Sequence, residues 1–248
     1  MNEDVTNMTP SQIMAYRKKI SFIWQNSIGS LSPRMSVGSL ITEGYKIHNL
    51  KDRDLKMEAD RLLKLVGLPT NIKERYAHEL SGGQARRVGV ARAIALNPKL
   101  IIADEPTAGL DVSVQGEILN LLNKLRDDLG VSLFVITHNL NIVRHISDRT
   151  AVMYLGRFVE QGQTDDIFAK PRHPYTLALL SANLTPYQET SLKNKIELTG
   201  EVPSLMDRPN GCEFHTRCPF CSKHCDDEFP PVHTFNGQQI LTCHYPLK

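Results

Sequence analysis

The chain has 248 residues, 41% of them hydrophobic, and its 29 Lys and Arg residues nearly balance its 27 Asp and Glu residues. This length suits one sizeable domain with a small appendage, and the balanced charge gives no basic field that would indicate nucleic acid or anionic lipid as a partner. The first residues, MNEDVTNMTPSQ, contain acids and no apolar run, and no stretch approaches the roughly 18 uninterrupted apolar residues of a membrane span. We therefore expect a soluble, cytosolic chain.

The N-terminal part of the sequence predicts a short helix, one strand and a helical region. The TPSQ stretch at residues 9–12 is a typical helix start, because Pro is tolerated at the first helical position and Thr and Gln can cap each other's amides; the helix is expected to run to about Lys18. Alternation over Ile20–Trp24 predicts a strand that ends at Gln25, before a loop rich in Ser, Gly and Pro. Apolar residues at helical spacing then predict a helical subdomain at residues 37–97.

The middle of the chain predicts the core of an α/β fold. An apolar run, Leu100–Asp104, is followed by a helical pattern from Val114 to Leu129 and by a second apolar run, Ser132–Thr137. Strand, helix and strand at this spacing indicate a crossover between two parallel strands. We therefore expect a parallel sheet with helices around it.

The C-terminal half predicts a hairpin followed by a less regular tail. After a helix around residues 140–146, two strand-like segments meet at Gly156–Arg157, which suits a tight hairpin. A further helix is expected at Pro174–Ser181, before a polar stretch and a Cys-rich and Pro-rich end. We place a main domain at residues 1–184 and an extension at residues 185–248.

The LSGGQ stretch at Leu80–Gln84 stands directly ahead of a helical pattern. The adjacent glycines Gly82 and Gly83 let backbone amides approach an anion closely at a helix N-terminus, and Ser81 adds a hydroxyl donor. The stretch, which Gln84 completes, therefore indicates phosphate binding. A plain glycine-rich turn capped by Ser81 is the alternative.

Two acids and a histidine are predicted at the carboxyl ends of the two central strands. Asp104 is placed to hold a magnesium ion on nucleotide phosphates, and Glu105 is placed to orient or deprotonate an attacking water. His138 follows the next strand and would lie beside both on the same rim of a parallel sheet. An ordinary strand-end turn before Pro106 and a structural histidine cap are the alternatives.

In this order, the motifs resemble those of ABC ATPases: LSGGQ as the signature, LIIADEP as the Walker B strand, AGLD as the D-loop, His138 as the switch histidine and Gln25 as the Q-loop glutamine. The resemblance implies a P-loop NTPase-like fold and an ATPase whose catalytic residues are Glu105, His138 and Gln25. It implies that ATP and Mg²⁺ are bound through Ser81, Gly82, Gly83, Gln84, Asp104 and Asp111. It also implies a head-to-tail dimer, homo- or heterodimeric, in which LSGGQ of one subunit closes over ATP held by the other.

Further stretches narrow the resemblance to the oligopeptide and dipeptide importer branch of that family. These stretches are SLSPRMSVG (Ser30–Gly38), DVSVQ (Asp111–Gln115), RHPYTLALLSA (Arg172–Ala182), LTGEVPS (Leu198–Ser204) and GCEFHTRCP (Gly211–Pro219). The chain departs from the usual pattern at Trp24, Asn26, Ser27, Ala108 and Gly109, which puts in doubt the fine tuning of the site and leaves the class unchanged. The resemblance implies ATP-driven import of peptides, with nickel or another small solute as a competing substrate.

The resemblance also implies partners and a location. We expect a second ABC ATPase subunit, two transmembrane permease subunits and, indirectly, an extracytoplasmic solute-binding protein, with no nucleic acid. The chain would lie peripherally on the cytoplasmic face of the cell membrane. A non-transport ABC ATPase of DNA repair or translation is a weaker alternative, because such proteins carry long heptad insertions or two cassettes and the sequence has neither.

All five cysteines, at positions 212, 218, 221, 225 and 243, lie near the C-terminus. In a reducing compartment such crowding suggests a metal site more than disulfides. The resemblance implies a four-iron four-sulfur cluster held by Cys212, Cys218, Cys225 and Cys243, and four thiolates are the right number. Zinc stays open, because Cys218 and Cys221 form a CPFC pair with His215, His224 and His244 nearby. Five unligated thiols are the third alternative.

A phosphate-binding loop of the form GxxxxGK[ST] does not occur in this sequence, which contains no Gly-Lys dipeptide. In the family that loop precedes the strand that ends at Gln25, so we expect a truncated chain that lacks the loop and the N-terminal strands. Isolated ATPase activity is then doubtful. As written, the chain would act as a catalytically incomplete partner that supplies LSGGQ to another ATPase.

Overall fold

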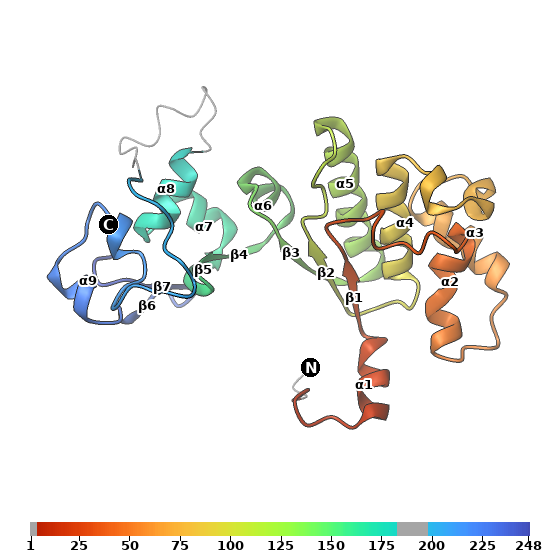
Figure 1. The fold of residues 1–248 in the computed structure, drawn as a ribbon, viewed down its shortest axis with the longest axis horizontal. Coiled ribbons are helices and arrows are strands. Elements are labelled where there is room, and N and C mark those ends of the chain that lie inside the picture. Colours follow the sequence, from red (N-terminus) through yellow and green to blue (C-terminus); the bar gives the residue numbers. More distant parts are fainter. Residues whose placement is uncertain (1–3, 183–197) are drawn as a thin grey trace. The chain divides into compact units, whose positions relative to one another are not determined.

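The computed structural model describes residues 4–182 and 198–248 (Figure 1). The chain divides into two compact units, Met1–His138 (unit 1) and Asn139–Lys248 (unit 2). The boundary predicted after residue 184 lies outside the described residues and stays a prediction. Within the described part of the chain, no helix is long and apolar enough to cross a membrane.

Unit 1 combines a small sheet with a group of helices. Its elements are α1 (Pro10–Arg17), β1 (Ile20–Ile23), α2 (Val37–Ile47), α3 (Leu55–Leu65), η1 (Thr70–Glu74), η2 (Ala77–Glu79), α4 (Gly82–Ile94), β2 (Leu100–Asp104), α5 (Val112–Leu129) and β3 (Ser132–Ile136). The predicted helix start is confirmed, because Thr9 caps α1 in a reciprocal capping box with Gln12. The predicted helical region at residues 37–97 contains α2, α3, η1, η2 and α4.

The sheet of unit 1 has the order β1-β2-β3, and all its strands are parallel. The predicted crossover is confirmed, since β2 and β3 pair directly and α5 connects them. Side chains alternate between the two faces of a sheet, and Ile23 and Ile101 are buried on one face. On the other face, the exposed Phe22 and Phe134 align across Ile102.

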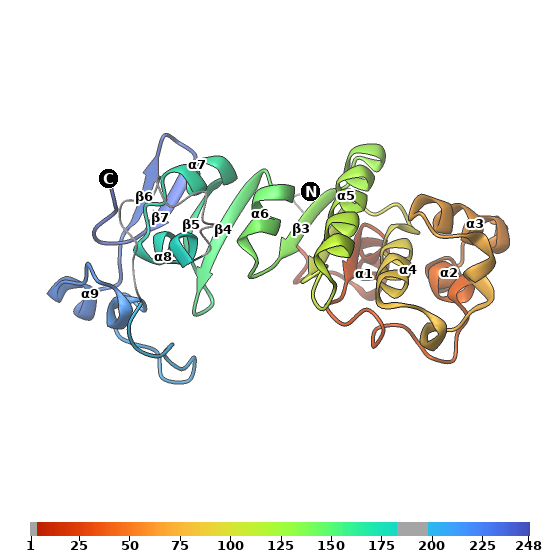
Figure 2. The same cartoon turned by 90° about the horizontal axis from the view of Figure 1, so that it is seen from above.

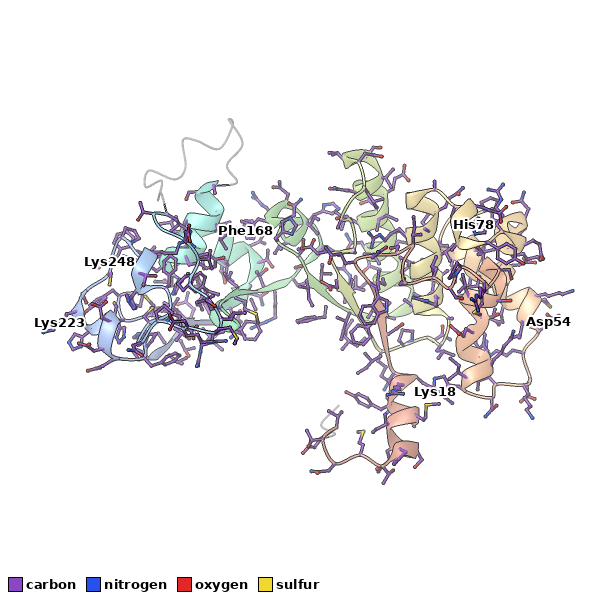
Figure 3. All side chains as sticks on the ribbon, viewed as in Figure 1. Lys18, Asp54, His78, Phe168, Lys223 and Lys248 are labelled. Carbon is purple, nitrogen blue, oxygen red and sulfur yellow. The ribbon has the colours of Figure 1, made fainter. Side chains whose placement is uncertain are left out.

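Helix α4 is the central helix of unit 1. It contacts α2, α3, α5 and β1, and Figures 1 and 2 show it between α5 and α2. Tyr45 of α2 is 2% exposed, and its hydroxyl donates to the carbonyl oxygen of Ala95 at 2.6 Å, just beyond the end of α4. Asp54, labelled in Figure 3, caps α3 by accepting hydrogen bonds from the amides of Lys56 and Met57. These contacts fix the helix that begins at the signature motif.

Unit 2 is built on an antiparallel sheet of order β4-β5-β7-β6. Its elements are α6 (Leu140–Ile146), β4 (Arg149–Tyr154), β5 (Arg157–Gln163), α7 (Thr164–Ala169), α8 (Pro174–Ala182), η3 (His215–Arg217), α9 (Lys223–Asp227), β6 (Val232–Phe235) and β7 (Gln239–Thr242). The predicted hairpin is confirmed, but its turn lies one residue earlier than predicted, at Leu155–Gly156, and Arg157 already belongs to β5. Leu155 and Gly156 both have positive φ, 45° and 80°, as a two-residue turn of this hand requires.

The C-terminal strands join the same sheet as the hairpin. Glu160 of β5 pairs with Leu241 of β7, and the Glu160 carboxylate is fully buried. It accepts hydrogen bonds from the amides of Arg172 (2.9 Å) and His173 (3.1 Å) and from the side-chain amide of Gln239 (2.7 Å). Because buried carboxylates need such donors, Glu160 ties β5, the start of α8 and β7 together.

Candidate functional site

The carboxyl ends of β2 and β3 bring Glu105, Thr137 and His138 together. One Glu105 oxygen, Oε1, lies 2.6 Å from Nδ1 of the His138 ring and accepts from the His138 backbone amide at 3.0 Å. The other, Oε2, accepts from the Thr137 hydroxyl at 3.1 Å. The side chain of Glu105 is 15% exposed and that of His138 is 88% exposed. The site therefore presents a nearly buried carboxylate behind an open imidazole.

Glu105 is held in an unusual backbone conformation. Its φ of 43° lies in the left-handed region, which non-glycine residues seldom adopt, and its amide donates to the carbonyl oxygen of Ile136 at 2.9 Å. Burial raises the pKa of Glu105, but the hydrogen bonds from the His138 ring, the His138 amide and Thr137 outweigh it and leave the pKa lowered. The carboxylate is thus kept ionised and aimed at the end of β3.

Asp104 is the last residue of β2 and pairs with Ile136 of β3. It is partly exposed, and its carboxylate has no hydrogen-bond or ion-pair partner among the described residues. A free carboxylate beside a phosphate site fits Mg²⁺, which takes one or two protein carboxylates and completes its shell with phosphate oxygens and water.

The LSGGQ stretch forms the start of α4. Ser81 is the N-cap: its hydroxyl accepts from the Gln84 amide at 3.3 Å, and its own amide donates to Gln84 Oε1 at 3.1 Å. The capping alternative raised from the sequence is therefore observed in this state. Gly83 packs tightly, because a Cβ there would lie 3.2 Å from Val114 of α5.

Not all the predicted residues join one bonded group. Gln25 follows β1 and is exposed, with no hydrogen-bond partner among the described residues. Asp111 caps α5 by accepting from the Val114 amide at 2.9 Å. Neither is bonded to the Glu105 and His138 pair within the described part of the chain.

Two residues of this region escaped prediction from the sequence. Thr137 completes the hydrogen bonds of Glu105, and its position between the end of β3 and His138 is a usable signal. Arg86 lies within α4 and is 3% exposed, with hydrogen bonds to the backbone near Gln25 and to the turn that follows Glu105. No periodicity marks a charged residue as buried, so the burial of Arg86 has no signal in the sequence.

Four of the five cysteines line a single cavity in unit 2. These are Cys212, Cys218, Cys225 and Cys243, which share the cavity with His173, Phe214, His215 and His244. Cys221 is not among the lining residues; it is exposed, and its thiol contacts Asp226 Oδ1 at 3.3 Å. As the side chains stand, the cavity, about 10 Å³, has room for about one water molecule. The structure therefore separates Cys221 from the four cysteines of the predicted cluster and divides the CPFC pair, because Cys218 lines the cavity and Cys221 does not.

The thiols of this cavity are shielded from water. Burial raises the pKa of Cys218 to about 11 and that of Cys243 to about 12, against backbone hydrogen bonds from Phe220 and Tyr245 that lower them. Burial also raises the pKa of Cys212. Across the described residues, no group of three or more His, Cys, Asp or Glu side chains is arranged to hold a single metal ion.

Comparisons with known proteins identify the family. A family model described as "ABC transporter" matches residues 1–108, and one described as "Oligopeptide/dipeptide transporter, C-terminal region" matches residues 159–225. The oligopeptide transport ATP-binding protein AppF of Bacillus subtilis is 40% identical over 98% of this chain and 74% of its own length. The chain belongs to the ABC transporter ATP-binding protein family.

Further relatives of this ABC protein carry similar names. The probable peptide ABC transporter ATP-binding protein y4tS of Sinorhizobium fredii is 43% identical over 97% of the chain and 68% of its own length. The oligopeptide transport ATP-binding protein OppF of Salmonella typhimurium is 42% identical over 93% of the chain and 70% of its own length. The predicted resemblance to the peptide importer branch is confirmed.

Solved structures agree on the fold of this ABC protein. The structure of cbiO1 from Clostridium perfringens, part of the ABC transporter complex cbiONQ, has a TM-score of 0.57 at 32% identity and covers 65% of this chain and 63% of its own. A dimeric, post-hydrolysis ATP-binding cassette, MJ0796 bound to ADP and Pi, has a TM-score of 0.59 at 27% identity over 66% of this chain and 71% of its own. The predicted α/β class is confirmed.

Proposed function

We propose that this ABC protein is an ATP-hydrolysing subunit of an importer for oligopeptides or dipeptides. The Glu105 carboxylate carries the proposal: it stands at the end of β2, kept ionised by Thr137 and His138 at the end of β3. A buried, ionised carboxylate beside an exposed imidazole suits activation of water for attack on a phosphate. The names of the relatives supply the peptide substrate.

The remaining site residues receive roles from their positions. The exposed ring of His138 can donate from Nε2 to the terminal phosphate of ATP when it is protonated on both nitrogens, because Nδ1 already donates to the Glu105 carboxylate. Asp104 would hold the magnesium ion, which neutralises phosphate charge when bound. Gln25 lies two residues beyond the end of β1, and we assign it to the same ion or to the attacking water.

The signature residues serve the other half of a dimer. Ser81, Gly82 and Gly83 stand at an exposed helix N-terminus, where backbone amides favour anions. Gln84 and Asp111 position the starts of α4 and α5 beside them. We assign these residues to ATP held by a second ATPase subunit, so closure of the dimer and hydrolysis alternate during transport.

Permease subunits are proposed to dock beside Gln25, on the cytoplasmic face of the membrane. An open groove of about 520 Å³ lies there, with Trp24 and Ser30 from the segment around Gln25, Glu43 from α2 and Arg92 from α4 among its lining residues. Because the groove combines apolar and charged side chains from two parts of unit 1, a partner bound in it would sense their relative movement.

ATP hydrolysis and uptake of a labelled oligopeptide by the assembled transporter in liposomes test the proposal. Glu105→Gln keeps the size of the side chain and removes the base, so kcat is expected to fall about hundredfold or more. Glu117→Gln, on the exposed side of α5, is the matched control and should hydrolyse ATP normally. Wild-type turnover by Glu105→Gln would refute the assignment. Hydrolysis that needs an added second ATPase subunit would give this chain the partner role.

We further propose that Cys212, Cys218, Cys225 and Cys243 hold a four-iron four-sulfur cluster. Their number, their shared cavity and the exclusion of Cys221 support the proposal, because such a cluster is held by four thiolates. When bound, the cluster would supply four iron–thiolate bonds that cross-link residues 212–243. Loading requires the thiols to lose their protons and the cavity to widen, because as the side chains stand it has room for about one water molecule.

Iron, acid-labile sulfide and zinc analysis of purified protein tests the cluster. Iron and sulfide in equal amounts, lost in Cys225→Ser and kept in Cys221→Ser, are expected. Zinc in place of iron, with Cys221→Ser as damaging as Cys225→Ser, would favour the zinc alternative.

A further inference from the structure

Arg86 is a buried cation without an anion. The residue lies in the second turn of α4 and is 3% exposed. Among the described residues no carboxylate forms an ion pair with it, and its Nε has no hydrogen-bond partner. Burial lowers the pKa of its guanidinium. An unpaired buried charge is costly, so a side chain of this kind needs an explanation beyond packing.

The guanidinium reaches two backbone segments that are far apart in sequence. Its Nη1 donates to the carbonyl oxygen of Trp24 at 2.9 Å, and its Nη2 donates to the carbonyl oxygen of Ala108 at 3.0 Å. Trp24 directly precedes Gln25, and Ala108 lies between Glu105 and Asp111. One planar cation therefore bridges the Gln25 segment and the 107–111 turn, using fixed donor directions that a lysine does not have.

The same helix begins with the signature residues. Gly82, at the start of α4, packs against the 107–111 turn, because a Cβ added at Gly82 would lie 3.6 Å from the side chain of Leu110. Three parts of the proposed nucleotide site thus meet at one turn of α4: the signature start, the strand end at Gln25 and the turn after Glu105. We propose that Arg86 is a positioning residue that makes the signature loop, the Gln25 segment and the 107–111 turn respond together.

Arg87, the next residue, offers a contrast within the same helix. It donates to the Val66 carbonyl oxygen at 2.8 Å and to the Glu117 carboxylate at 2.7 Å, so its charge is paired. Its contacts join α4 to the end of α3 and to α5, away from Gln25. Arg87→Met is therefore the matched control for Arg86→Met. It makes the same substitution at the next position of α4 but keeps the contacts of Arg86 with the Gln25 segment and the 107–111 turn.

The first test needs no nucleotide. Trp24 is the only tryptophan, so fluorescence quenching by acrylamide and amide exchange at residues 22–30 and 106–111 report directly on both segments. Arg86→Met should speed exchange in both by about tenfold, since each segment loses a hydrogen bond to a charged group. Arg87→Met should leave both unchanged. Unaltered quenching and exchange in Arg86→Met would overturn the proposal.

Thermal unfolding distinguishes a positioning role of Arg86 from a role in the stability of the fold. Arg86→Met removes the cost of a buried, unpaired charge but leaves the Trp24 and Ala108 carbonyl oxygens without this donor, so the two effects oppose each other and Tm should stay close to that of wild type. Arg86→Lys, which keeps the charge without the fork, should also free both segments. If Arg86→Met is too unstable to purify, Arg86→Lys alone decides: wild-type exchange in Arg86→Lys would overturn the proposal.

The second test rests on the proposed ATPase function. In the assembled transporter, Arg86→Met should lower kcat about tenfold with KM for ATP nearly unchanged, and it should add little to Gln25→Ala, because both act through one segment. Additive effects would overturn the link to Gln25. A wild-type complex that hydrolyses no ATP would instead refute the proposed function. The fluorescence and exchange results would still test the positioning role of Arg86.

Discussion

The two units of this ABC protein place their reactive groups in opposite settings. In unit 1, Glu105 and His138 stand at the ends of parallel strands, where the imidazole is open to solvent and the carboxylate is held by its neighbours. In unit 2, four cysteines line a small cavity, and none of them lies on a strand of the antiparallel sheet. The groups proposed to meet a substrate thus stand at a rim, whereas the thiols proposed to hold a cluster are enclosed. Changes in each unit should therefore affect different measurements.

The largest expected effect falls on unit 1. His138→Ala removes the imidazole bonded to Glu105, and ATP hydrolysis by the assembled transporter should fall about hundredfold, or roughly 3 kcal/mol. Loss of that hydrogen bond should also raise the pKa of Glu105 toward its ordinary value, shifting the acid limb of the rate profile to higher pH. Iron content in unit 2 should not change; if it does, the two units are not independent.

The next effect falls on unit 2. Gly211 has φ of 62°, and a Cβ there would lie 2.4 Å from the Cys225 carbonyl oxygen. Gly211→Ala should therefore destabilise unit 2 by about 3 kcal/mol, measured by denaturant unfolding, and should reduce iron content. Gly237→Ala is the control, because Gly237 has a similar φ of 68° with open space around it, and it should lose only about 1 kcal/mol. Equal losses in both variants would contradict the steric argument.

The pH dependence of unit 2 gives a smaller effect. Burial lowers the pKa of His173 to about 3 from 6.5, so the neutral ring is favoured by the folded state. Stability is unaffected above the unfolded pKa and falls as the pH drops from 6.5 toward 3, by about 2 kcal/mol at about pH 5. His173→Asn keeps an acceptor for the Tyr175 amide and should flatten this slope in acid unfolding experiments. An unchanged slope would assign acid sensitivity to other groups.

The smallest effect concerns the open face of the unit 1 sheet. Phe134 is 53% exposed and Ile136 is 48% exposed, so Phe134→Thr should change the free energy of unfolding by less than about 0.5 kcal/mol. Light scattering of the purified chain should show weaker self-association, because parallel sheets normally have both faces covered and an open apolar face favours contact with other molecules. A large loss of stability would mean that this face is already packed.

Local patterns in the sequence predicted most of the structural features that depend on neighbouring residues, such as helix caps, turns and strand crossovers. The capping box of Thr9 and Gln12, the β4–β5 hairpin, whose turn was predicted one residue too late, and the crossover between β2 and β3 all depend on residues close together in the chain. The predicted parallel arrangement of the two central strands also places Glu105 beside His138, as the structure shows.

Contacts between residues far apart in the sequence, and the burial of particular side chains, could not be predicted from such local patterns. The burial of Arg86 depends on how α4 packs against segments 62 and 22 residues away in sequence. The resemblance predicted the four cysteines, but no spacing rule explains why Cys221 does not line the cavity. The Cys221 thiol contacts the Asp226 carboxylate outside the cavity. Desolvation of the sulfur and then the Asp226 carboxylate raise the pKa of Cys221 to about 12, although the residue as a whole is exposed. Strand β7 is short and joins β5 across a long stretch of chain, so no periodicity predicted that pairing.

The hydrogen bond between Glu160 and Gln239 has a consequence for synthesis on the ribosome. The two residues lie 79 positions apart, so at ordinary elongation rates Glu160 is made about 4 to 16 s before its partner. The β4–β5 hairpin forms in microseconds, and during the wait the Glu160 carboxylate can be solvated by water in place of Gln239. Unit 2 therefore completes its sheet late in translation, and chaperones that protect nascent chains have several seconds in which to bind the incomplete sheet.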